Sequence, residues 1–151
     1  MKKILFNDPY LKKNIYNTEI DIYNTNNHLQ YIYNLINNID FSYNNIILKE
    51  LKKKYSSYKS QDKLKKKYDE KQNITFQELL FKLLKSNLKC YYCRETLKLI
   101  YQNKNETTQW SLERFDNNIG HYNSNTCISC LKCNIQRRTD NHEYFKMGKQ
   151  L

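Results

Sequence analysis

The chain has 151 residues, enough for one compact domain or for a small domain with an extension, and it carries 26 Lys or Arg against 15 Asp or Glu. A net charge of +11 favours a polyanionic partner, with nucleic acid first and an acidic membrane surface second. Two glycines and one proline argue against a collagen-like chain, a flexible linker or an all-β fold with many tight turns. No apolar run approaches membrane-spanning length, so we expect no membrane partner.

The first 47 residues are rich in Asn and Tyr and carry no net charge, with four Lys and four acids. Within them, residues 28–39 place apolar side chains at helical spacing and predict one short helix. The alternative for residues 1–47 is a tethered, partly ordered arm with a poor core.

Residues 48–87 are the main electrostatic feature, with twelve Lys and five acids. The string LKKKY occurs at 51–55 and again at 64–68, which is low-complexity resemblance and not a structural repeat. Leu48, Leu51, Tyr55 and Tyr58 are spaced to share one face of a helix, and the intervening SSYKSQD is able to break it. The lysines form either a solvated helix surface or a surface that contacts phosphates, because Lys acts there as a point charge that is blind to sequence. The candidate DNA contacts in this segment are Lys52, Lys53, Lys54, Lys65, Lys66 and Lys67.

The segment that follows is better defined. Thr75 and Glu78 form a capping-box pattern, and the apolar side chains after them predict a helix that ends near Asn87. Beyond it we predict short strands at 96–101, 109–115 and 125–129, and helices at 130–138 and 140–147.

Five cysteines stand in CYYC (90–93) and TCISCLKCN (126–134). Two C-x-x-C pairs that folding brings together give the tetrahedral sulfur site of structural zinc. Cys127 lies inside a predicted strand, where a small buried residue suffices, and so we expect it to be the surplus cysteine. The predicted zinc ligands are Cys90, Cys93, Cys130 and Cys133. The chain has an odd number of cysteines in C-x-x-C spacing and shows no secretory signal. This combination favours a reducing intracellular compartment over secretion.

The motifs CYYC, LERFDN, GHYNSN, CLKCN and HEYF, in this order, resemble the zinc-bearing branch of the HNH (ββα-metal) endonucleases. The resemblance covers residues 84–147, less than half of the chain. It implies an α+β fold, with a ββα-metal zinc-knuckle nuclease domain at 73–151 behind a mainly helical, basic extension at 1–72. It also implies cleavage of DNA phosphodiester bonds with a catalytic Mg²⁺ or Mn²⁺ besides the structural Zn²⁺.

Carried over onto this sequence, the resemblance makes Glu113 and Asn134 the ligands of the catalytic ion. Asn125 takes the place of the asparagine that braces the loop between the strands. Zinc then anchors the start of the helix that carries Asn134 against the strand that carries Glu113.

The sequence departs from the family at the general base. The family has His directly after the strand acid, whereas this chain has Arg114, which does not accept a proton near neutral pH. His121 is the substitute base, or else an ordinary turn histidine. Asp116 binds metal, positions water or caps its turn, and Arg114 is a candidate phosphate clamp.

The helix after the second cysteine pair adds Arg137 and Arg138 as candidate DNA contacts, with a solvated helix surface as the alternative. Three functions are compatible with these features. The first is an HNH-type endonuclease that acts on DNA, including branched or single-stranded DNA, with RNA as an alternative and a homodimer needed for one-step double-strand cleavage. The second is a zinc-stabilised nucleic-acid-binding module that lacks the base, and the third is an assembly protein that packages nucleic acid.

Overall fold

The computed structural model describes residues 20–151, and the first 19 residues of the expected arm lie outside this range. The described part is a mixed α/β structure with one small antiparallel sheet. Its elements in chain order are short 3₁₀ turns at Ile20–Tyr23 and Thr25–Asn27, α2 (His28–Ile36), α3 (Asn44–Leu64), α4 (Phe76–Lys85), β1 (Trp110–Arg114), a 3₁₀ turn at Asn123–Asn125, β2 (Thr126–Cys130), α5 (Leu131–Arg137) and α6 (His142–Gln150). Within residues 20–151, none of the helices has the length and apolar character that crossing a bilayer requires.

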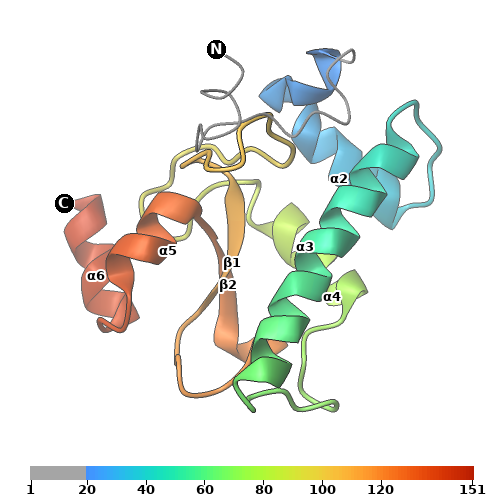
Figure 1. Ribbon diagram of the computed structural model, residues 1–151. Coiled ribbons are helices and arrows are strands. Elements are labelled where there is room, and N and C mark those ends of the chain that lie inside the picture. The colour runs from blue at the N-terminus through green and yellow to red at the C-terminus, as the bar shows by residue number, and fades with distance from the viewer. Residues whose placement is uncertain (1–19) are drawn as a thin grey trace, which may run out of the picture.

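The two strands form a hairpin at the centre of the molecule, with α5 and α6 on one side of it and α3 and α4 on the other (Figure 1). The strands pair in register from Trp110 opposite Cys130 to Arg114 opposite Thr126. Every residue of β2 is buried, as expected for a strand that is covered on both faces. The strands predicted at 109–115 and 125–129 are therefore confirmed.

Helix α3 is one continuous helix through SSYKSQD, which does not break it, and it ends at Leu64. The inner face of this stretch is held by the hairpin: the hydroxyl oxygen of Tyr58 accepts a hydrogen bond from the Leu112 backbone N–H at 3.1 Å. One turn further on, the Asp62 carboxylate accepts from the His121 backbone N–H at 2.7 Å. These tertiary contacts outweigh the modest helix propensity of the serines.

The segment before α3 also contributes to the core, so the alternative of an arm with a poor core does not hold for residues 20–47. Ile22, Ile32 and Ile47 are fully buried. They belong to one hydrophobic cluster that extends from Ile22 to Cys133. Both parts of the predicted division at residue 72 therefore contribute to a single apolar core.

The predicted strand at 96–101 does not form, although Leu97 and Leu99 are buried. The segment pairs only through isolated bridges, Lys89 with Thr96 and Lys98 with Gln109. The Leu99 backbone N–H donates to Nδ1 of His28 at 3.1 Å instead of to a neighbouring strand. A side chain from the N-terminal segment thus replaces a ladder hydrogen bond.

The remaining helix predictions are confirmed. Helix α4 begins with a complete capping box, in which Thr75 accepts from the Glu78 backbone N–H and Glu78 accepts from the Thr75 backbone N–H. Helix α5 starts directly after Cys130, and α6 starts after Asn141, whose side chain accepts from two backbone N–H groups of its first turn.

Candidate functional site

The four predicted zinc ligands lie together. The sulfur atoms of Cys90, Cys93, Cys130 and Cys133 are all within 4.8 Å of one another. The Cys93 and Cys130 sulfurs are 3.9 Å apart, close to the spacing of about 3.8 Å that a tetrahedral site with zinc–sulfur bonds of about 2.3 Å requires. The four cysteines could therefore hold a metal ion such as zinc.

Backbone N–H groups point at these sulfurs, as in a site for thiolates. The N–H groups of Tyr92 and Cys130 each donate to the Cys90 sulfur at 3.3 Å, and the Cys133 N–H donates to the Cys130 sulfur at 3.3 Å. The hydrogen bond shared with Cys130 and the backbone N–H groups of Tyr92, Cys93 and Cys130 lower the pKa of Cys90, whereas the same shared hydrogen bond raises the pKa of Cys130. The thiolate is the form that binds metal, so the local backbone favours coordination.

Cys127 is not part of this group of sulfurs. It is the second residue of β2, directly opposite Glu113, and is 7% exposed. Burial raises the pKa of its thiol, and the Glu113 charge raises it further. Cys127 is therefore a neutral buried side chain.

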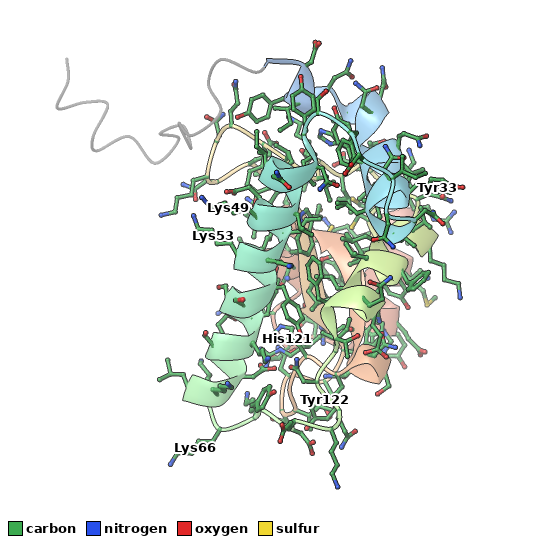
Figure 2. All side chains as sticks on the ribbon, turned by 90° about the vertical axis from the view of Figure 1, so that its right-hand side faces the viewer. Tyr33, Lys49, Lys53, Lys66, His121 and Tyr122 are labelled. Atoms are coloured by element: carbon green, nitrogen blue, oxygen red, sulfur yellow. The ribbon has the colours of Figure 1, made fainter. Side chains whose placement is uncertain are left out.

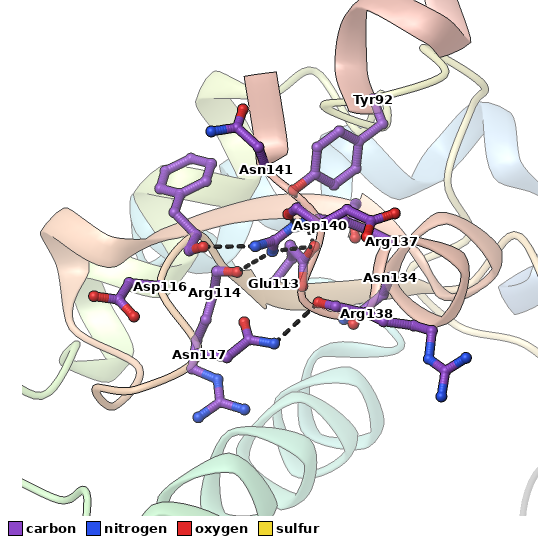
Figure 3. A network of polar contacts seen from close by, with 12 residues as sticks. Tyr92, Glu113, Arg114, Asp116, Asn117, Asn134, Arg137, Arg138, Asp140 and Asn141 are labelled. Atoms are coloured by element: carbon purple, nitrogen blue, oxygen red, sulfur yellow. Dashed lines mark hydrogen bonds and ion pairs between the residues drawn. The ribbon is translucent and has the colours of Figure 1, made fainter. Parts of the chain in front are cut away.

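The carboxylate of Glu113 is held by two protein groups (Figure 3). Oε2 accepts from the Tyr92 hydroxyl at 2.9 Å and from a guanidinium nitrogen of Arg137 at 3.0 Å. Glu113 is 4% exposed and Arg137 is 2% exposed. Burial raises the pKa of Glu113, while the hydrogen bonds from Arg137 and Tyr92 oppose that rise.

Arg137 has further partners besides Glu113. Its guanidinium also donates to the backbone carbonyls of Arg114, Phe115 and Asp140. An arginine with this many buried partners crosslinks the end of β1 to the end of α5. Both hydrogen bonds fall on Oε2 of Glu113, beside a fixed guanidinium charge, so this geometry disfavours a divalent cation, and the expected Mg²⁺ or Mn²⁺ at Glu113 stays a prediction.

Asn134 lies on the same side of the hairpin as Glu113. Its amide donates to the Ser111 hydroxyl at 3.1 Å, and Ser111 precedes Glu113 by two residues on β1. Side chains two apart on a strand share a face, so α5 covers the face of β1 that carries Ser111 and Glu113. Asn134 and Glu113 therefore lie on the same side of the hairpin, although Asn134 bonds to Ser111 and Glu113 bonds to Tyr92 and Arg137.

The proposed base and the phosphate clamp lie on the other side of the hairpin, under α3. His121 is 3% exposed, and its Nδ1 is 2.9 Å from a carboxylate oxygen of Asp62. Burial lowers the pKa of His121, with the Asp62 charge opposing. Arg114 donates to the Ile119 carbonyl and lies 4.0 Å from Asp62. The structure does not bring His121 to Glu113 and Asn134.

The loop between the strands is organised by Asn125 and Asp116. The Asn125 side chain accepts from the Asp116 backbone N–H and donates to the carbonyls of Asp116 and Gly120, each at 3.0 Å. Asp116 accepts from the Asn118 backbone N–H at 2.9 Å, which is a turn-capping contact. Gly120 allows close approach, because a Cβ there would lie 2.5 Å from the Lys67 carbonyl oxygen.

The candidate DNA-binding residues divide into two groups. Lys52, Lys53, Lys65, Lys66 and Arg138 are exposed. The other three are used inside the protein: Arg137 as described above, Lys54 through Nζ contacts to Tyr101, Gln109 and Trp110, and Lys67 through the Asn117 carbonyl. The charged groups of these three bond to protein oxygens in this structure, so the five exposed residues are better placed for phosphate, and phosphate contact stays a prediction for all eight.

Sequence reasoning missed Asp62 and Tyr92, which hold His121 and Glu113 respectively. Asp62 had a signal, since it is an isolated acid between lysines in a basic segment. Tyr92 had none, because it is one of 14 tyrosines.

No protein-family model matches this chain, and searches of curated proteins and of solved structures found no match. The functional argument therefore depends on the geometry of the described residues.

Proposed function

We propose that this chain is a nucleic-acid-binding protein, with DNA as its main partner, built on a zinc-anchored HNH-like ββα frame. The observation that carries the proposal is the charge on the outer face of α3. Its exposed cations are Lys49, Lys52, Lys53 and Lys63, and both acids of α3, Glu50 and Asp62, are buried. Lys49 and Lys53 point away from the body of the protein, and His121 lies on the inner side of the helix (Figure 2).

This separation of charge suits a phosphate backbone. Exposed lysines that neutralise phosphates release condensed counterions, which supplies affinity without regard to sequence. The exposed lysines Lys65 and Lys66 extend the same run beyond the end of α3. A surface that only kept the protein soluble would need no such exclusion of acids, since mixed charges serve that purpose.

The HNH-like frame is the second part of the proposal. The order β1, β2 and α5, with two zinc ligands at the start of α5, agrees with the resemblance described above. Binding is favoured over catalysis because Arg137 neutralises Glu113 and because His121 lies on the other side of the hairpin.

Binding can be measured by fluorescence anisotropy with a labelled duplex at several salt concentrations. We expect Lys53→Glu to weaken binding several-fold and to reduce the slope of log K against log salt by about one. Lys104→Glu makes the same charge change at an exposed loop residue and serves as the control. Equal loss from both variants would reduce the effect to net charge, and absence of binding by the unaltered chain would overturn the proposal.

A second candidate function is a metal-dependent HNH endonuclease. The observation that favours it is the placement of Glu113 and Asn134 on one face of the hairpin. Asn134 is half-buried, and its amide has a single neutral partner, so its removal tests catalysis with little effect on the fold.

The assay is nicking of supercoiled plasmid, and cleavage of branched DNA, with Mg²⁺ or Mn²⁺ and with EDTA. An endonuclease would nick the plasmid only when Mg²⁺ or Mn²⁺ is present. Asn134→Ala would abolish nicking, while the zinc content and the circular dichroism spectrum stay unchanged. Nicking that persists in Asn134→Ala would rule out this site, and absence of nicking at high protein concentration would leave the binding function alone.

A further inference from the structure

A cavity of about 640 Å³ lies between the end of α4, the first cysteine pair, β2 and α6. No residue of α3 lines it, so it is separate from the lysine surface proposed above. Its volume falls within the usual range for small-molecule sites, about 300–1,000 Å³. It is therefore large enough for one nucleotide.

The lining of this cavity carries positive charge and no acid. It contains five cations and no Asp or Glu, and the cations are Lys82, Lys85, Lys89, Arg94 and Lys146. A zinc ion bound by four thiolates would leave an excess of negative charge beside Cys90. The five positive charges of the lining exceed it. The cavity thus favours an anion.

These cations contact neutral groups, and the acid Glu78 attracts Lys82 without forming an ion pair with it. Lys82 Nζ donates to the Asn123 and Thr126 carbonyls at 2.7 and 2.8 Å, and Lys89 Nζ donates to the Thr96 hydroxyl at 2.7 Å. Arg94 donates to the side-chain oxygen of Gln150 at 3.2 Å. All of these partners are neutral, and among residues 20–151 no ion pair joins any of the five cations to an acid.

Aromatic rings supply the second half of the site. Tyr91 and Phe115 line the cavity, with ring centroids 5.5 Å apart at an interplanar angle of 60°. Phe115 is fixed from behind by His142 at 4.2 Å, and the Lys146 ammonium lies 4.0 Å from the centre of the Tyr91 ring. Rings beside cations are the combination by which proteins bind unpaired nucleotides, since the base stacks on a ring while the phosphate meets the charge.

We propose that this cavity binds an unpaired nucleotide of a single-stranded nucleic acid. The inference rests on the proposed nucleic-acid-binding function and names the form of nucleic acid that a second surface accepts. A paired base cannot enter a cavity while it remains stacked in a duplex, so the cavity selects single strands, flaps or frayed ends. The lysines of α3 bind phosphates in either form.

The test compares anisotropy of a labelled single strand of about 12 nucleotides with that of the matching hairpin duplex. We expect the double variant Lys85→Glu/Lys146→Glu to weaken single-strand binding at least about tenfold and duplex binding by a much smaller factor. Tyr91→Leu should lower single-strand affinity about tenfold through lost stacking. The double variant Lys49→Glu/Lys53→Glu makes the same charge change on α3 and is the matched control, which should weaken both forms to a similar extent.

The outcomes separate the two proposals. If Lys85→Glu/Lys146→Glu weakens both forms equally, or neither, the cavity is not a single-strand site, although binding through α3 stands. If the unaltered chain binds neither form, the proposed function fails as well. Should Tyr91→Leu lose its zinc or its fold, the double variant decides alone, because Lys85 is exposed and the Lys146 ammonium, which lies over the Tyr91 ring, forms no ion pair among residues 20–151.

Discussion

At the scale of single residues, Arg137 and Arg138 show how neighbours of the same type divide into different roles. Arg137 is 2% exposed and bonds Glu113 together with backbone carbonyls from β1 and from the residues after α5. Arg138 is exposed, and its backbone carbonyl accepts a hydrogen bond from the Asn117 side chain, while its guanidinium has no hydrogen bond among residues 20–151. Both were candidates for phosphate contact, and Arg138 is the better placed of the two.

We predict that Arg137→Met destabilises the protein by about 3–5 kcal/mol, because it leaves the Glu113 carboxylate buried without its counter-charge. Arg138→Met should change the free energy of unfolding by no more than about 0.5 kcal/mol. Urea unfolding followed by circular dichroism measures both. The double variant Arg137→Met/Glu113→Met should recover part of the loss, since it removes both charges. Equal stability of the two single variants would show that the ion pair has no structural role.

At the scale of elements, the four-cysteine cluster joins two segments that are far apart in sequence. Cys90 and Cys93 belong to a knuckle bound to β2 through the Tyr91 N–H and the Ile128 carbonyl at 2.8 Å. Cys130 and Cys133 begin α5. A bound ion would therefore fix the start of α5, a helix of only seven residues that would be marginal alone.

We predict that the purified chain holds about one zinc ion and that Cys133→Ser abolishes this binding and lowers the melting temperature, because structural zinc contributes directly to folding. Cys127→Ala is the matched control. It should retain zinc, at a packing cost of roughly 1 kcal/mol. Metal analysis and thermal melts with and without EDTA provide the measurements. Loss of zinc from Cys127→Ala would contradict the assignment of the surplus cysteine.

At the scale of the whole molecule, the two sequence regions share one core. Ile22, Ile32 and Leu51 belong to the same apolar cluster as Leu79 and Ile128. Polar contacts cross the same boundary, from Tyr58 to Leu112 and from Asp62 to His121. The basic α3 is therefore both the outer charged surface and a wall of the core.

We predict that a fragment of residues 73–151 does not fold cooperatively even with zinc, because it would expose the buried faces of α4 and the hairpin. The amide NMR spectrum should show poor dispersion, whereas the full chain with zinc should show good dispersion. A well-dispersed spectrum from the fragment would mean that the C-terminal region is an independent domain and that α3 only docks on it.

Much of the local structure was predictable from the sequence. Helix α4 has its capping box and apolar stripe, the β1 and β2 segments follow the expected pattern, and the cysteine spacing specifies the metal ligands. Each of these depends on residues that are close in sequence or on a spacing that only one coordination geometry satisfies. Even the choice of Cys127 as the surplus cysteine followed from its position within a strand.

Only the tertiary structure decided which charges are buried and what they meet. Contacts between segments tens of residues apart decide these partners. They decide whether Glu113 meets a guanidinium or a metal ion, whether His121 meets Asp62 or solvent, and whether Lys54 faces a ring or a phosphate. Sequence patterns specify periodicity and ligand spacing. The identity of a buried partner is set by packing, because desolvated charges need a counter-charge or hydrogen bonds wherever the fold supplies them.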